Sequence, residues 1–264
     1  MSRFLFDHLD ELGRRIDAAR SLALFLDFDG TLVPLNDSPD QVQLPPSLRR
    51  RLLALSNQEN RIVAVVSGRQ RSDLQARVNV PGLVYAGNHG LEISGPGFLF
   101  IEPSAIDYRD KMVEFAKGLE TRVKGIPGAW VEDKGLTLSV HSRLVGPEQS
   151  DDLRRIVHAA LEYTSHPFVL SLGDHVYEIR PRVDWDKGTA VRWIRERMGV
   201  PDALSIYIGD DRTDEDAFAA IAEGITIKVG EPTETTAGYY VRSPAEVERF
   251  LEWLTIREHV EQTV

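Results

Sequence analysis

Short apolar runs that alternate with amphipathic segments constrain the fold of this chain most strongly. The runs at 22–28, 61–68 and 82–90 have the length and composition of buried strands, and segments with helical spacing separate them. Helical spacing over residues 4–20 predicts a further helix before the first strand. The same alternation returns after residue 186. This order of strands and helices predicts an α/β fold with a Rossmann-like parallel sheet.

The segment from 103 to 182 has a different pattern. Paired apolar runs lie close together around 129–143 and 167–181, and a helical segment precedes each pair. Hairpins of this kind are typical of an α+β module. We therefore predict a core made of residues 1–102 and 183–264 that is interrupted by an inserted α+β domain.

The composition narrows the possible functions and locations. With a net charge of −10 the chain lacks the basic surface that nucleic acid requires, and without cysteine it can form no disulfide or thiolate site. The first residues do not form a secretion signal, and no apolar run reaches the roughly 20 residues that span a bilayer. We expect a cytoplasmic protein that binds neither nucleic acid nor membrane.

Polar residues end several of the expected core strands. Asp27 and Asp29 follow the first strand, Ser67 follows the second, and Asp210 follows a later one. Lys187 opens the helix before that later strand. Taken singly, such residues are common in turns and helix caps. Because ligands of open α/β sheets bind beyond the carboxyl ends of the strands, we expect these groups to meet at one site.

The residue types at this site favour phosphoryl transfer. Residues two apart in a strand point the same way, so Asp27 and Asp29 are expected to face the site together while Phe28 enters the core. A cluster of carboxylates favours Mg²⁺, which prefers oxygen ligands. One aspartate can then act as the nucleophile and the other as general acid and base. Ser67 and Lys187 would donate hydrogen bonds to the phosphoryl oxygens.

The motifs DFDGT, SGR, a lysine and GDDRTDED occur in the order that resembles the haloacid-dehalogenase superfamily of phosphohydrolases, and the resemblance covers most of the chain. It implies that Asp27 forms an aspartyl-phosphate, that Asp29 is the acid/base, and that the inserted domain is a cap. It also implies Mg²⁺ as cofactor. The metal ligands implied are Asp27, Asp29 (through its backbone carbonyl), Asp210, Asp211 and Asp214.

Two segments of the cap resemble motifs of the trehalose-6-phosphate phosphatase family. VEDKGLTLSVHSR (131–143) and SLGDHVYEIRP (171–181) match the family spacing, although Ser142 stands where the family usually has an aromatic residue. The resemblance implies that charged cap residues bind the glucose hydroxyls, for which charged hydrogen-bonding groups are well suited. The substrate-binding candidates are Arg69, Asn88 and His89 in the core and Glu132, Lys134, Arg143, Glu178 and Arg180 in the cap.

Three functions are compatible with these motifs. The first is Mg²⁺-dependent hydrolysis of trehalose 6-phosphate. The second is the same chemistry on another sugar phosphate, such as sucrose phosphate, mannosyl-phosphoglycerate or phosphomannose. The third is a catalytically silent partner of a trehalose-phosphate synthase, although silent relatives usually lose motif carboxylates that this chain keeps. A sugar phosphate is thus the expected small-molecule partner, and a trehalose-phosphate synthase is a possible protein partner.

Overall fold

The chain folds into two compact units. The structure is a computed structural model that describes residues 2–36, 41–163, 168–173 and 175–261. The first unit consists of Met1–Phe100 together with Trp185–Val264, and the second of Ile101–Asp184.

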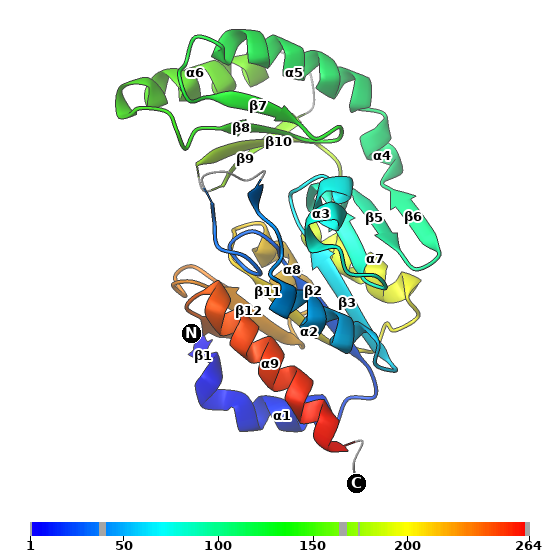
Figure 1. Ribbon diagram of the computed structural model, residues 1–264. Coiled ribbons are helices and arrows are strands. Elements are labelled where there is room, and N and C mark those ends of the chain that lie inside the picture. The colour runs from blue at the N-terminus through cyan, green and yellow to red at the C-terminus, as the bar shows by residue number, and fades with distance from the viewer. Residues whose placement is uncertain (1, 37–40, 164–167, 174, 262–264) are drawn as a thin grey trace. The chain divides into compact units, whose positions relative to one another are not determined.

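The first unit is built on a nine-stranded sheet in the order β1-β13-β12-β11-β2-β3-β4-β5-β6 (Figure 1). All neighbours from β1 to β4 are parallel, and β5 is antiparallel to β4. The predicted α/β fold class is confirmed. The strands are β1 (Arg3–Phe4), β2 (Leu22–Leu26), β3 (Arg61–Val66), β4 (Val84–Gly87), β5 (Glu92–Gly95), β6 (Phe98–Ile101), β11 (Leu204–Gly209), β12 (Ile225–Val229) and β13 (Tyr239–Val241).

Helices bury both faces of this sheet, which explains why its strands read as continuous apolar runs. In β2, Leu22, Leu24 and Leu26 pack against α1, α2, α3 and α9, while Ala23 and Phe25 pack against α7 and α8. The helical elements are α1 (Leu9–Asp17), α2 (Pro46–Ser56), α3 (Arg71–Val78), α7 (Lys187–Arg197), α8 (Asp214–Ala220), α9 (Pro244–Glu261), and the 3-10 turns η1 (Leu5–His8) and η3 (Asn88–Gly90).

The helix predicted over residues 4–20 is shorter than expected. It begins at Leu9, because Arg3–Phe4 instead form the edge strand β1, which pairs with β13. The Arg3 amide donates to the carbonyl oxygen of Gly238 at 3.0 Å. A strand of two residues is too short to show an alternating pattern in the sequence.

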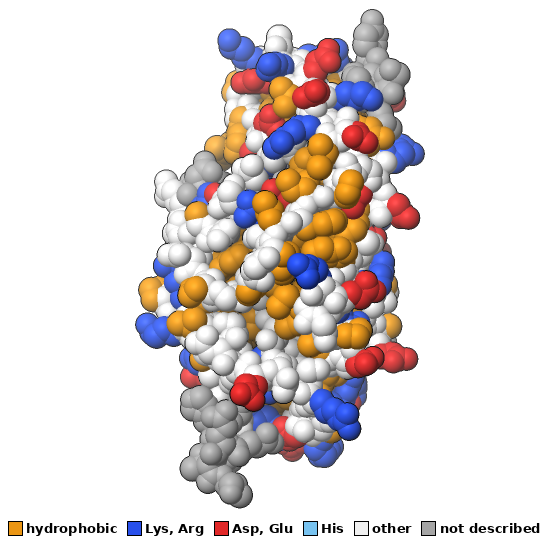
Figure 2. Space-filling view, turned by 90° about the vertical axis from the view of Figure 1, so that its right-hand side faces the viewer, with side chains coloured by type: hydrophobic (Ala, Val, Ile, Leu, Met, Phe, Trp, Pro, Cys, Tyr) orange, Lys and Arg blue, Asp and Glu red, His pale blue; other side chains and the backbone are white. Residues whose placement is uncertain are grey.

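The strand β6 ends the sheet on the other side and carries apolar residues. Figure 2 views the molecule from the side on which β6 lies, and apolar side chains gather on this face. Phe100 stacks on Trp193 with ring centroids 4.3 Å apart and lies 5.3 Å from Trp185. These aromatic rings join the core that α7 forms with the sheet.

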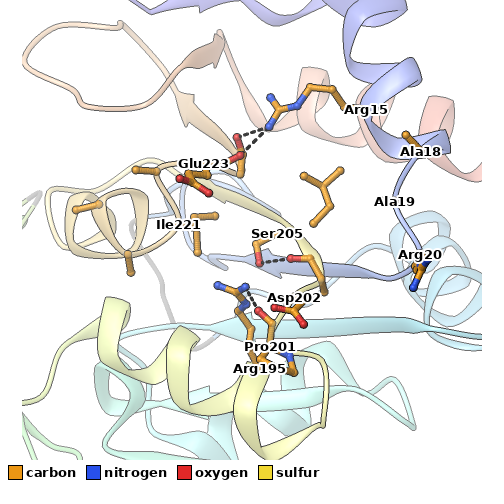
Figure 3. Close-up of a pocket in the computed structure, with 16 residues that line it drawn as sticks. Arg15, Ala18, Ala19, Arg20, Arg195, Pro201, Asp202, Ser205, Ile221 and Glu223 are labelled. Atoms are coloured by element: carbon orange, nitrogen blue, oxygen red, sulfur yellow. Dashed lines mark hydrogen bonds between the residues drawn. The ribbon is translucent and has the colours of Figure 1, made fainter.

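A pocket of about 780 Å³ lies at the amino ends of β11 and β12 (Figure 3). Arg15 donates to the carbonyl oxygens of Glu223 and Gly224, and Arg195 donates to that of Pro201. These arginines hold the surrounding loops together. The sequence predicts the functional site at the carboxyl ends of the strands, so this pocket lies at the opposite ends of the same strands.

The second unit has an antiparallel sheet in the order β7-β8-β10-β9 with helices packed on one face (Figure 1). None of the helices that the structure describes is long and apolar enough to cross a bilayer. The elements of this unit are α4 (Pro103–Ile106), α5 (Arg109–Val123), β7 (Trp130–Asp133), β8 (Leu138–His141), α6 (Pro147–Tyr163), β9 (Phe168–Gly173) and β10 (Val176–Pro181).

Candidate active site

The first acidic motif leaves the sheet directly after β2. The Asp27 amide donates to the carbonyl oxygen of Ile208 at 2.9 Å, so Asp27 remains aligned with the neighbouring strand β11. Phe28 is fully buried, as predicted, and its carbonyl oxygen accepts a hydrogen bond from the Leu32 amide at 2.9 Å. The chain therefore turns sharply within the motif instead of continuing as a strand.

Three carboxylates come together at the carboxyl edge of the sheet. One oxygen from each of Asp27, Asp210 and Asp214 lies within 4.8 Å of the other two. Lys187 Nζ lies 3.1 Å from Asp27 Oδ1 and 2.7 Å from Asp214 Oδ1. Asp27, Asp214 and Lys187 are buried. A buried group of oxygen ligands fits a hard divalent cation such as Mg²⁺.

The electrostatics of this cluster also favour a cation. Burial, together with the charges of Asp214 and Asp210, raises the pKa of Asp27 well above its usual value. Burial and the charge of Asp214 raise the pKa of Asp210 to about 7. Burial disfavours the charged form of Lys187 and by itself would lower its pKa. The negative charges of Asp214 and Asp27 outweigh this effect, so the pKa of the lysine is raised. A divalent cation would offset the excess of carboxylates over ammonium groups.

The pKa of Asp210 predicts how stability depends on pH without divalent cations. An aspartate in the unfolded chain has a pKa of about 4, whereas Asp210 in the folded chain has a pKa of about 7. The protonated form stabilises the fold below pH 4, and this contribution is lost as the pH rises through 7. We expect the decline in Tm across this window to be shallower in Asp210→Asn, because the amide does not titrate. Thermal unfolding in chelator from pH 4 to 8 measures it.

The matched control for this experiment is Asp10→Asn, which changes an exposed carboxylate in α1. It should show the same decline as the wild type. If Asp210→Asn also declines as steeply as the wild type, then Asp210 is not the group that loses its proton in this range.

Asp29 does not join the three-carboxylate cluster. Its two carboxylate oxygens accept hydrogen bonds from Arg69 Nε at 2.6 Å and Nη2 at 2.8 Å. The turn after Phe28 directs the carboxylate of Asp29 to Arg69, whereas the carboxylate of Asp27 lies at Lys187, so the motif is not the continuous strand that was expected. The carboxylate of Asp211 is also outside the cluster and lies 3.3 Å from the Thr213 hydroxyl.

The segment from Ser67 to Arg69 is held by the turn η3 that follows β4. The His89 amide donates to the carbonyl oxygen of Ser67 at 2.9 Å, and the Asn88 amide donates to that of Arg69 at 2.7 Å. Asn88 and His89 have φ values of 49° and 58°, a left-handed conformation that asparagine adopts more readily than most residues. The Asn88 side chain donates to Glu92 at 2.8 Å. These contacts position the Ser67 loop, while substrate binding by the two residues stays a prediction.

In the second unit, three cap residues lie in one row across the sheet. Glu132 on β7 pairs with Ser139 on β8, which in turn pairs with Glu178 on β10. Because the flanking residues of these strands pack against α5 and α6, this row lies on the opposite face. Lys134 Nζ lies 3.4 Å from Glu178 Oε1, and His141 Nε2 lies 2.9 Å from Glu132 Oε2. The sheet thus brings together three predicted substrate ligands, Glu132, Lys134 and Glu178.

The other two cap candidates lie farther along the same strands. Arg180 is two residues after Glu178 on β10 and shares its face, whereas Arg143 follows the end of β8. His141, the last residue of β8, stacks on Trp130 with ring centroids 3.8 Å apart. This stack fixes the imidazole that contacts Glu132.

The family model of the trehalose-phosphatases matches residues 25–245. Probable trehalose-phosphate phosphatase D from Arabidopsis thaliana is 35% identical over 269 residues, covering 95% of this chain and 70% of the relative. The chain belongs to the trehalose-phosphatase family. This confirms the resemblance seen in the sequence, and the chain is therefore a phosphomonoester hydrolase.

Further relatives support this family assignment. Trehalose 6-phosphate phosphatase RA3 from Zea mays is 35% identical, covering 92% of this chain and 72% of the relative. The crystal structure of a trehalose-6-phosphate phosphatase related protein has a TM-score of 0.79 and 25% identity, covering 90% of this chain and 99% of that one. The C-terminal domain of trehalose-6-phosphate phosphatase from C. albicans has a TM-score of 0.82 at 20% identity, which supports the fold.

Two polar contacts near the carboxylate cluster were not predicted from the sequence. The Tyr207 hydroxyl donates to Asp214 Oδ1 at 2.7 Å, and Lys228 Nζ donates to the backbone carbonyl of Asp210. A lysine in the otherwise apolar end of the strand ITIKV was the available signal for Lys228. Tyr207 gave no such signal, because a tyrosine inside a strand is usually part of the core.

The close approach of Gly30 to Asp210 predicts a sensitive position. Gly30 has φ +76°, and a Cβ atom there would lie 2.0 Å from Asp210 Oδ2. Gly30→Ala should therefore move that carboxylate, and a displacement of this kind can lower the turnover about 10²-fold. Phosphate release at saturating substrate measures the effect.

Gly97→Ala is the control for this change. Gly97 has φ +78°, but no atom lies within 4 Å of the position of a Cβ there. In both variants the alanine must adopt a left-handed backbone conformation, which costs about 1–2 kcal/mol, so both should have a lower Tm than the wild type. Only Gly30→Ala should lose turnover. Equal turnover in the two variants would mean that the position of the Asp210 carboxylate does not limit catalysis.

Proposed function

We propose that this chain hydrolyses trehalose 6-phosphate to trehalose and phosphate through an aspartyl-phosphate on Asp27. The observation that supports this most is the burial of Asp27 against Lys187, within the carboxylate cluster of Asp210 and Asp214. The activity named for the relatives, which are about 35% identical over most of the chain, supports the choice of substrate.

The proposed reaction has two steps at phosphorus. A carboxylate oxygen of Asp27 attacks phosphorus, and the bond from phosphorus to the sugar oxygen breaks. Asp29 protonates that oxygen, so trehalose leaves and Asp27 carries the phosphoryl group. Ionised Asp29 then accepts a proton from a water molecule whose oxygen attacks phosphorus. Phosphate leaves, and the Asp27 carboxylate is regenerated.

Lys187 and Ser67 stabilise the charge that spreads over the phosphoryl oxygens in both steps. Lys187 is fixed for this role because Asp214 and Asp27 hold its ammonium group from two sides. Ser67 is held by the backbone contact from η3. Both groups are in place before the substrate arrives, so little reorganisation is needed during the reaction.

Asp29 meets opposite requirements in the two steps. Its two carboxylate oxygens accept hydrogen bonds from Arg69, which orients the carboxylate for its role as a base in the second step. As an acid in the first step Asp29 must carry a proton, so this pair has to open when substrate binds. Arg69 can then turn to the substrate, which is the role that the family resemblance implies for it.

The donor set fits Mg²⁺. The carboxylates of Asp27, Asp210 and Asp214 would hold it, and the family resemblance adds Asp211 and the backbone carbonyl of Asp29. When bound, Mg²⁺ neutralises the negative charge between the nucleophile and the phosphate.

Phosphate release from a panel of sugar phosphates tests the proposal. We expect kcat/KM for trehalose 6-phosphate to exceed that for sucrose phosphate or mannosyl-phosphoglycerate by about 10²-fold or more, because buried polar groups strongly disfavour mismatched substrates. Chelator should abolish release, and Mg²⁺ should restore it. A preference for another ester would assign that substrate instead. A failure to release phosphate with any metal would favour a silent partner of a trehalose-phosphate synthase.

The row of cap residues predicts a change in substrate affinity. Glu132→Gln should raise KM about tenfold, because hydrogen bonds from sugar hydroxyls to a charged carboxylate are stronger than those to an amide. The turnover at saturating substrate should change much less. Glu114→Gln in α5, which alters an exposed glutamate of the same unit, should leave both constants unchanged. An unchanged KM in Glu132→Gln would remove that residue from the sugar site.

Two further proposals concern the cellular location of the protein and a protein partner. A cytoplasmic location and association with a trehalose-phosphate synthase stay predictions of the sequence. Fractionation and co-purification with the synthase of the same organism would test the two separately.

A further inference from the structure

Tyr207 belongs to β11, the strand that lies between β2 and β12 in the core sheet (Figure 1). Its side chain is fully buried on the face covered by α7 and α8. The ring stacks on Phe25 with centroids 6.4 Å apart and meets the Phe218 ring edge-on at 5.7 Å. These contacts fix the direction of the hydroxyl, which is therefore a precisely placed donor.

The acceptor of this hydroxyl is Asp214, one of the three clustered carboxylates. Asp214 Oδ1 accepts from Tyr207 at 2.7 Å and also from Lys187 at 2.7 Å. Asp214 Oδ2 accepts from the Asp211 amide at 2.9 Å. The carboxylate is thus held at both oxygens, and rotation about its Cβ–Cγ bond would break these contacts.

Tyr207 differs from Lys187 because it donates without adding a positive charge. Burial and the charge of Asp214 raise the pKa of Tyr207 well above its usual value, so the phenol stays neutral. A neutral donor can orient Asp214 without competing electrostatically with a bound cation. Partners that orient metal ligands in this way typically contribute 10–100-fold to metal affinity or activity.

We propose that Tyr207 is a positioning residue that fixes the Asp214 carboxylate, and thereby both the divalent-cation site and the Lys187–Asp27 contact. This inference rests on the proposed metal-dependent function. Tyr207 need not touch the substrate, and its effect reaches the reaction through Asp214.

Another tyrosine of the same sheet provides a matched comparison. Tyr85 on β4 is also buried, and its hydroxyl donates to the carbonyl oxygen of Val80 at 2.6 Å. The hydroxyl also accepts from the Val80 amide at 3.0 Å, so it is satisfied by backbone groups alone. Tyr207→Phe and Tyr85→Phe each remove one hydrogen-bonded hydroxyl from the core, so both should lower Tm. Only Tyr207 contacts a carboxylate of the cluster.

The test compares Mg²⁺ binding and kinetics of the two variants with those of the wild type. We expect Tyr207→Phe to raise the Kd for Mg²⁺, measured by calorimetry, about tenfold. The same variant should lower kcat about tenfold at saturating Mg²⁺. KM for the sugar phosphate should change less than twofold. Tyr85→Phe should retain the wild-type Kd, kcat and KM. If Tyr207→Phe behaves like Tyr85→Phe in these quantities, the inference is wrong.

A second measurement keeps the test independent of the folding of Tyr207→Phe. 3-Fluorotyrosine placed at position 207 alone should change its ¹⁹F resonance when Mg²⁺ is added, and the same probe at position 85 should not. An unchanged resonance at 207, in a protein that binds Mg²⁺, would overturn the inference. If the wild type itself binds no Mg²⁺, the proposed metal-dependent function fails instead, so the two failures are distinguishable.

Discussion

Asp27→Asn is expected to lower phosphate release about 10⁴-fold or more while leaving the fold at least as stable as the wild type. The amide cannot attack phosphorus, so the covalent step is lost. The same change removes a buried negative charge that lies beside two other carboxylates, and burial of that charge already raises the pKa of Asp27. Without Mg²⁺ the neutral side chain should therefore be tolerated well.

Two measurements on the same samples separate these effects. Phosphate release at saturating trehalose 6-phosphate gives the turnover, and thermal unfolding in chelator gives the stability. The exposed Asp10 in α1 supplies a control, since Asp10→Asn should match the wild type in both. Substantial Mg²⁺-dependent turnover in Asp27→Asn would mean that another group attacks phosphorus.

Much of the core arrangement could be predicted because parallel strands impose it. Asp27 follows β2 and Asp210 follows β11, and these strands are direct neighbours in the sheet. Once the strands are recognised from their apolar runs, the topology places both residues at one edge. Lys187 could be assigned to the same place because it begins the helix that precedes β11.

The sequence could not predict details that depend on tertiary contacts. The turn within the first motif directs Asp29 to Arg69, and it requires the positive φ of Gly30, which a strand-based prediction does not include. The edge strand β1 and the contact of Tyr207 with Asp214 depend equally on distant partners. Local patterns predict which residues enter the core, but they do not predict which buried polar groups meet there.

Lys187→Met is expected to lower both stability and activity, because this lysine is the ammonium group inside the carboxylate cluster. It is 2% exposed and contacts both Asp27 and Asp214. Removing one partner from a buried ionic group leaves charge uncompensated and costs about 3–5 kcal/mol. For a chain of this size, the corresponding fall in Tm is roughly 10 °C. The loss of a donor to the phosphoryl oxygens should lower kcat about 10³-fold.

The pH dependence of this loss distinguishes a charge effect from a packing effect. At low pH the remaining carboxylates can take up protons, so the destabilisation should be small near pH 4 and large near pH 8. Mg²⁺ should restore part of the stability of Lys187→Met at pH 8, since it supplies the missing positive charge, but it should not restore the turnover. Lys117→Met, at an exposed position of α5, should show none of these effects. A fall in Tm that is the same at every pH and unaffected by Mg²⁺ would assign Lys187 a role in packing. The site would then need another source of positive charge to hold Asp27 and Asp214 so close together.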